Sequence, residues 1–198
     1  MKLKTRYADL KISRKLTAGF LTIVLLAVLV GGAGIFSILS IERNDNLLYK
    51  EDTLSLQYAG DAGVAFMQLR YNSLKRLYAG DQASVIDAVK NVKTSISQVD
   101  KLLDQCQKTN SNSEINALLG QMQTEWGTYM QAVSKENDAA LKDEIVEYNA
   151  DTAKLADQLR DNFTTLFEKV SAAAAAKAAQ NKAESRLATM LVAVILVV

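Results

Sequence analysis

The sequence contains no histidine and no proline, and only one cysteine, in 198 residues. Without histidine, the chain lacks the commonest general base and the commonest metal ligand. Cys106 alone can form neither an intramolecular disulfide nor a thiolate metal cluster, and its place in an apolar helical pattern predicts an inert buried thiol. We therefore expect a protein that is not an enzyme and that has no catalytic residues, no metal site and no cofactor.

The charges of the chain are nearly balanced but unevenly distributed. Residues 1–15 carry six basic residues and one acidic residue, whereas residues 42–186 carry 17 basic and 21 acidic residues. Between them, residues 16–41 form a run of 26 residues without a charge. At about 1.5 Å per residue, a helix of this length crosses a hydrocarbon core roughly 30 Å thick. We interpret residues 1–15 as a basic cytoplasmic tail and residues 16–41 as a transmembrane helix.

A second uncharged run, residues 187–198, is 12 residues long and therefore shorter than the about 20 residues of a spanning helix. We expect it to be the start of a second transmembrane helix that the chain cuts short; a short tail anchor is the alternative. A cleaved signal peptide is the alternative for the first run, which however exceeds the about 7–15 apolar residues of such peptides. Basic residues stay in the cytoplasm, so residues 42–186 are expected outside the membrane, and the tail is expected to face lipid and not nucleic acid.

Residues 42–186 predict an all-α antiparallel up-down-up-down four-helix bundle flanked by the transmembrane helices. Apolar residues recur there at alternating spacings of three and four, which is typical of a buried helix seam, and no segment alternates with a period of two. The absence of proline agrees with long helices. The expected seams are Leu47, Leu54, Tyr58, Ala62, Ala65 and Leu69; Val85, Val89, Val92, Ile96, Val99, Leu103 and Cys106; Ile115, Leu119, Met122, Trp126, Tyr129 and Val133; and Leu141, Ile145, Tyr148, Thr152, Leu155, Leu159, Phe163, Leu166 and Val170.

Short polar segments predict where these helices end. Gly80 is expected to end the first helix in a left-handed conformation, and Asp81 to cap the second. Ser111 stands three residues before Glu114, which is the spacing of a capping box at the start of the third helix. A third break is expected at residues 136–138. Short connections of this kind favour antiparallel neighbours.

One cluster of polar residues is a candidate ligand site. Within residues 67–78, several side chains that can donate hydrogen bonds, Asn72 among them, lie within two helical turns. The candidate ligand-binding residues are Arg70, Ser73, Lys75 and Arg76. Arginine guanidinium groups bind carboxylates with two parallel hydrogen bonds. The alternative is a solvated face whose charges pair with carboxylates of neighbouring helices.

The chain resembles the N-terminal sensory part of a methyl-accepting chemotaxis protein with a four-helix-bundle ligand-binding domain. The resemblance is carried by residues 11–20 (KISRKLTAGF), 69–76 (LRYNSLKR) and 78–81 (YAGD), and by the alanine-rich residues 171–179 before the second apolar run.

The resemblance implies a homodimer in the bacterial inner membrane that binds a small-molecule ligand or a binding protein between subunits. It implies ligand contacts for Arg70 and Arg76. It further implies slight movement of the last helix and control of a downstream kinase and adaptor through a cytoplasmic part beyond Val198. Two alternatives stay open, namely the sensor region of a membrane histidine kinase or cyclase, and a structural surface protein without a ligand.

Overall fold

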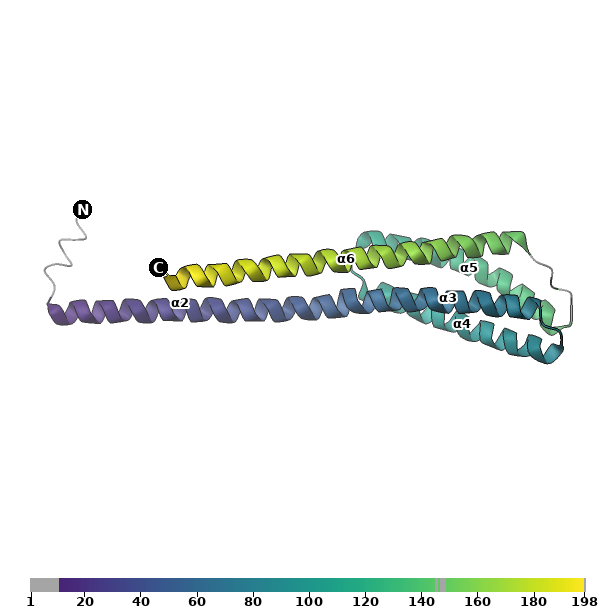
Figure 1. Cartoon of the computed structure of the whole chain (residues 1–198), viewed down its shortest axis with the longest axis horizontal. Coiled ribbons are helices and arrows are strands. Elements are labelled where there is room, and N and C mark those ends of the chain that lie inside the picture. Colours follow the sequence, from purple (N-terminus) through teal and green to yellow (C-terminus); the bar gives the residue numbers. More distant parts are fainter. Residues whose placement is uncertain (1–10, 145, 147–148, 198) are drawn as a thin grey trace. The chain divides into compact units, whose positions relative to one another are not determined.

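The computed structural model describes residues 11–144, 146 and 149–197, and it shows helices and no strand among them. Residues 46–178 form one compact unit, and residues 11–45 with 179–197 form another. The elements, labelled in Figure 1, are α2 (Ile12–Leu47), the π-helix η1 (Leu48–Thr53), α3 (Leu54–Leu77), α4 (Gln82–Thr109), α5 (Ser113–Leu141) and α6 (Ala150–Val197).

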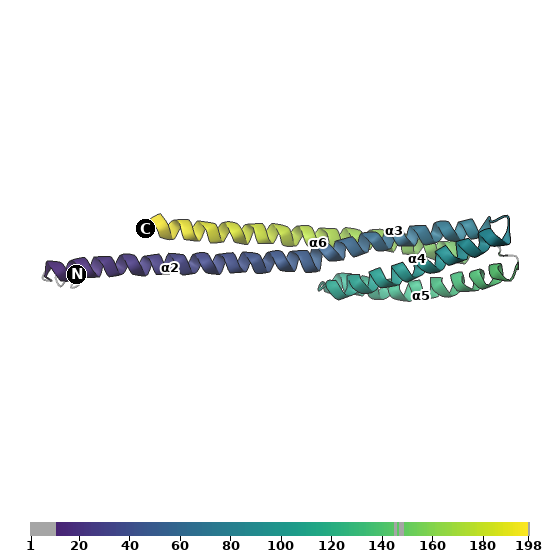
Figure 2. The same cartoon turned by 90° about the horizontal axis from the view of Figure 1, so that it is seen from below.

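The unit of residues 46–178 is a four-helix bundle. The helices α3, α4, α5 and the first part of α6 run along one another, and the chain reverses direction at each connection (Figures 1 and 2). The predicted all-α fold with its antiparallel up-down-up-down bundle is confirmed.

Much of the core of the bundle consists of residues that the three-four spacing predicts, most completely in α5. Phe66 and Ala156 are buried although they were not predicted, whereas the predicted Val85, Ile96 and Leu155 are only half-buried. All six predicted seam residues of α5, from Ile115 to Val133, are buried. Phe66 lies at the centre, stacked on Phe163 with ring centroids 5.0 Å apart, and its ring meets Trp126 and Tyr129 edge-on. Packing of this kind stabilises a bundle through burial of apolar area and through aromatic pairs.

The seam of the first bundle helix is displaced by one residue at its start. Ser55 and Ala59 are buried, whereas the predicted Leu54 and Tyr58 are only half-buried. The physical reason is η1, because a π-helix has a wider turn than an α-helix and so shifts which residues face the core. The side chain of Leu47 lies outside the described residues.

Two of the predicted helix ends need correction. Gly80 was expected to be left-handed, but no described glycine has a positive φ. Instead α3 closes through hydrogen bonds from the amides of Tyr78 and Ala79 to carbonyls of the last turn, so no left-handed residue is needed. Asp81 does cap α4, because its side chain accepts a hydrogen bond of 2.8 Å from the Ser84 amide.

The start of α5 is capped by Asn112 and not by Ser111. The Asn112 side chain accepts hydrogen bonds from the amides of Glu114 and Ile115. The Ser111 hydroxyl instead donates to Glu51 at 3.1 Å, and this contact withdraws it from the capping position.

The predicted break at residues 136–138 is wrong, because α5 continues to Leu141. The side chains of Glu136 and Asn137 accept hydrogen bonds from Arg76 instead of ending the helix. The end of α5 has Asp143 at a φ of 61°, which is the left-handed conformation of helix C-termini. Leu141 therefore belongs to α5, and two further predicted seam residues of the last helix, Ile145 and Tyr148, lie outside the described residues.

The other unit contains the uncharged run of α2. Within the described part of the chain, one continuous helical run, Ile12–Leu77, is long enough and apolar enough to cross a membrane. Its apolar stretch is exposed. The hydroxyls of Thr17 and Thr22 donate to the carbonyls four residues before them, so these two polar groups are satisfied inside the helix. In the same unit, Asn44 of α2 donates a hydrogen bond of 3.1 Å to Glu184 of α6.

Candidate functional site

Three of the four candidate residues line one cavity at the far end of the bundle from η1. Arg70, Ser73 and Arg76 of α3 face this cavity of about 260 Å³, which we call the distal cavity. Lys75 lies on the exposed side of α3 and approaches Asp87 of α4 at 3.5 Å. Leu74 and Leu77 of α3 also line the cavity. The remaining walls come from α5, α6 and the segment before α6, with Tyr129, Val133, Glu136, Val146, Asn149, Thr152, Ala153, Ala156 and Asp157 in the lining.

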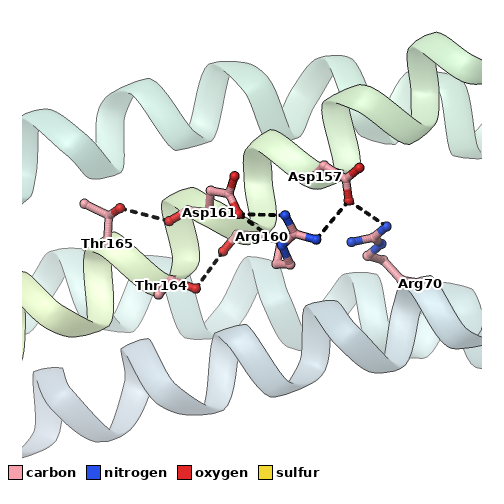
Figure 3. Close-up of polar contacts among 6 residues, drawn as sticks. All are labelled: Arg70, Asp157, Arg160, Asp161, Thr164 and Thr165. Atoms are coloured by element: carbon pink, nitrogen blue, oxygen red, sulfur yellow. Dashed lines mark hydrogen bonds and ion pairs between the residues drawn. The ribbon is translucent and has the colours of Figure 1, made fainter.

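Arg70 connects α3 to a chain of charges on α6. Its Nη2 lies 3.0 Å from Asp157, and the same carboxylate oxygen lies 3.2 Å from Arg160 (Figure 3). Arg160 also donates two hydrogen bonds to Asp161. Asp157 is half-exposed, so its attraction to Arg70 is screened by water. The contact is therefore one that a competing anion can break.

Arg76 is almost completely buried, with a side chain that is 2% exposed. Its terminal nitrogens donate to Asn137 and to Glu136 of α5. Its Nε has no hydrogen-bond partner among the described residues. An unsatisfied buried donor normally costs about 1–3 kcal/mol, so an acceptor that reached this nitrogen would remove that cost.

Tyr129 gives the cavity a neutral hydroxyl. Burial raises the pKa of Tyr129 to about 12. The positive charge of Arg70 acts in the opposite direction and lowers this pKa, but burial has the larger effect. The phenol therefore keeps its proton at neutral pH and can donate a hydrogen bond.

The N-terminus of α6 also opens on the cavity. Asn149 accepts hydrogen bonds from the amides of Asp151 and Thr152 and thereby caps the helix. The positive end of a helix dipole favours an anion nearby. Together with the arginines, this end makes the cavity rich in donors.

The sequence contained signals for two buried polar residues, of which Arg76 was among the candidate site residues and Asn137 was not. Asn137 is buried four residues after Val133, at a position where the α5 seam continues. Arg76 is seven residues after the buried Leu69, so it also lies on a seam. A polar residue at a seam position is the signal of a buried polar contact. Asp157 carries no such signal, because its role depends on where α6 lies against α3.

A second surface of interest is apolar and lies on the outside of α3. Apolar side chains that are at least half exposed recur there at spacings of three and four. We call them the outer stripe, and they are Val64, Met67, Tyr71, Leu74 and Tyr78. Beside it, α3 and α6 enclose an open groove of about 630 Å³. A Cβ atom at Gly60 would lie 3.4 Å from the Phe167 ring, which is an ordinary van der Waals contact.

At the other end of the bundle, an ion pair joins α6 to η1. Lys177 lies 2.9 Å from Glu51 and 3.2 Å from Asp52. The hydrogen bond from Lys177 lowers the pKa of Glu51, and in return it raises the pKa of Lys177. This contact holds the last bundle helix against the π-helix.

Nothing in the described residues groups three or more acidic or cysteine side chains so that they could hold a metal ion. Cys106 is buried beside Ser55, and burial raises the pKa of its thiol. The side chains that line the distal cavity can bind a ligand through hydrogen bonds and charge.

The comparisons with known proteins agree with this geometry. A family model described as a four helix bundle sensory module for signal transduction matches residues 9–188. No curated protein matches the chain, and neither does any solved structure. Since the match covers most of the chain, including the whole bundle, the chain belongs to the family of four-helix-bundle sensory modules for signal transduction.

Proposed function

We propose that the chain is the sensor region of a transmembrane chemoreceptor, which binds a signal outside the cell and relays it across the membrane to control chemotaxis signalling. The observation that carries the proposal is the extent of α6. In this single helix of 48 residues, Asp157 lies near the start and lines the distal cavity. The same helix includes the core residues Leu159 and Leu166. It ends in the uncharged run of residues 187–197. One element thus contains both ligand-side and membrane-side residues.

The proposed topology places the basic N-terminal tail in the cytoplasm, residues 16–41 across the bacterial inner membrane and residues 42–186 outside. The apolar, exposed stretch of α2 and the positive-inside rule support it. A cysteine introduced at Ser111, in the exposed connection between α4 and α5, should react in whole cells with a membrane-impermeant maleimide, in a Cys106→Ser background. Labelling only after the cells are lysed would contradict this topology.

We further propose that two copies of the chain pair through the outer stripe of α3. Its positions alternate with spacings of three and four, which is the pattern of a helix that packs against another helix. A twofold axis makes such a stripe complementary to itself, because the same residues face one another. Contiguous exposed apolar side chains of this size are otherwise a liability in water.

Disulfide cross-linking tests the dimer. In a Cys106→Ser background, cysteine at Met67 or Tyr71 should form disulfide-linked dimers in membranes under mild oxidation. Cysteine at Lys93, an exposed position of α4, is the matched control and should remain monomeric. Equal cross-linking at the three positions would overturn the proposed interface.

Signal relay is tested with a chimeric protein. Residues 1–198 joined to the cytoplasmic part of a chemoreceptor should control the autophosphorylation of its histidine kinase in reconstituted membranes. Lys177→Met removes the ion pair that holds α6 to η1 and should change the basal kinase activity. If neither this variant nor any stimulus changes the activity, the sensory function is refuted.

A further inference from the structure

We infer that the distal cavity of a single subunit binds a short-chain monocarboxylate, whose carboxylate group takes Arg70 from Asp157 and accepts a hydrogen bond from Arg76 Nε. The inference rests on the proposed sensory function, because it names the class of ligand that the sensor would detect. It places the ligand inside one four-helix bundle and not between two copies.

The donors of the cavity point to an anion. Arg76 lines the cavity and is buried, and its Nε lacks a partner within the described part of the chain, so the fold leaves one charged donor of a lining residue unsatisfied. Arg70, Ser73 and the neutral hydroxyl of Tyr129 line the same space. A carboxylate accepts several such hydrogen bonds at once, and charge-assisted bonds are the stronger kind.

The charges of the cavity favour a single negative charge. Its two arginines are balanced by Glu136 and Asp157, so a second full negative charge would be left without a counter-charge. One negative charge is accommodated because Asp157 has a second partner. When Arg70 turns to the ligand, Asp157 keeps its ion pair with Arg160 at 3.2 Å (Figure 3).

The remaining lining favours a short aliphatic tail. The cavity is small, at about 260 Å³, and apolar side chains come from every helix that forms it. These are Leu74 and Leu77 of α3, Val133 of α5, and Ala153 and Ala156 of α6. A tail of two or three carbons buries apolar area there, whereas a ligand without carbon gains nothing from these walls.

Binding would change the contacts of α6 directly. In this structure, Arg70 attaches Asp157 to α3 at 3.0 Å. Loss of this contact leaves Asp157 and Arg160 paired within α6, so that α6 is freed from one polar attachment to α3. The ligand would thus act on the helix that leads to the membrane.

The test uses the 198-residue chain in lipid nanodiscs and measures binding by calorimetry. Sodium propionate and butyrate are the probes, and propionamide is the neutral control of matched shape. We expect saturable propionate binding and about tenfold or more weaker binding of propionamide, since the amide cannot form the charged contacts. Inorganic phosphate and glycine are comparison ligands, which test whether the cavity prefers another anion or a zwitterion to a monocarboxylate. Tighter binding of either one than of propionate would overturn the assignment.

Variants locate the binding site. Arg70→Gln should weaken propionate binding about tenfold or more, and Arg76→Lys, which keeps the charge but lacks Nε, should do the same. Lys75→Gln is the neighbouring control and should bind as the unchanged chain does. Asp157→Asn should bind several-fold more tightly, because it removes the competitor for Arg70. The exposed Asp104→Asn, whose partner Lys108 lies on α4 away from the cavity, should have no effect.

These outcomes are separate from those of the kinase chimera. Propionate binding that does not depend on Arg70, Arg76 or Asp157 would overturn the inferred site. Binding that follows the expected order, with no effect of propionate on the kinase, would support the site and refute the sensory function. No binding of propionate or butyrate would overturn the ligand class and leave the chimera experiment to decide whether the chain is a sensor.

Discussion

Replacement of Arg76 by methionine is the most direct test of the buried ion pair at the distal end of the bundle. The side chain of Arg76 is 2% exposed and that of its partner Glu136 is 20% exposed. Methionine fills a similar volume but leaves the carboxylate of Glu136 and the side-chain amide oxygen of Asn137 without their donor. The adjacent Lys75 is 46% exposed, and its approach to Asp87 spans 3.5 Å, so Lys75→Met is a matched control.

The expected loss follows from the burial of the pair. Removing one partner from a buried ion pair costs about 3–5 kcal/mol, and the partial exposure of Glu136 reduces this to about 2–4 kcal/mol. Lys75→Met should change the free energy of unfolding by about 0.5 kcal/mol or less, as exposed pairs do. With a urea dependence of about 2 kcal/mol per molar, the unfolding midpoint of Arg76→Met should fall by roughly 1–2 M.

The assay is urea unfolding followed by the fluorescence of the single tryptophan, Trp126. This residue lies in the core of α5 and donates a hydrogen bond of 2.6 Å to Asp100, so its emission reports on the bundle. Adding Glu136→Gln to Arg76→Met should recover part of the loss, because it removes the unpaired charge. If Arg76→Met and Lys75→Met have the same midpoint, the ion pair contributes nothing in solution and the reasoning is refuted.

Three further results are expected. Cys106, whose pKa is raised by burial, should react with a thiol reagent at pH 8 at least about a hundredfold more slowly in the folded protein than in urea, and an equal rate would show that it is accessible. The pKa of Glu51 is lowered and that of Lys177 is raised, so their pair should stabilise the bundle above about pH 4.5 and below about pH 10.5 and be lost outside this window. The difference in urea midpoint between the unchanged chain and Lys177→Met should therefore shrink at both extremes, and a difference independent of pH would contradict the pair. Asn112→Ala should destabilise the bundle by about 1 kcal/mol through loss of the α5 cap, whereas Ser111→Ala should cost less, and the reverse order would restore Ser111 as the cap.

The bundle itself could be predicted because it depends on local spacing. Residues such as Leu119, Met122 and Val133 recur with the period of a helix, so the sequence alone shows which of them share a buried face. The helix ends were harder. At residues 136–138 a polar triplet resembled a break, but Arg76 from another helix satisfies it, and no local rule contains that partner.

The candidate site shows the same division. The sequence by itself determined that Arg70, Ser73, Lys75 and Arg76 lie within two turns of one helix, because a helix has a fixed period. Only the tertiary structure decided that Lys75 faces Asp87 on the outside, while Arg76 is buried against α5 and Arg70 meets Asp157 of α6. Such contacts join residues 12 to 87 positions apart, and they depend on how the helices pack against one another. Helical periodicity constrains which residues of one helix share a face, whereas only packing determines which residues of the other helices they meet.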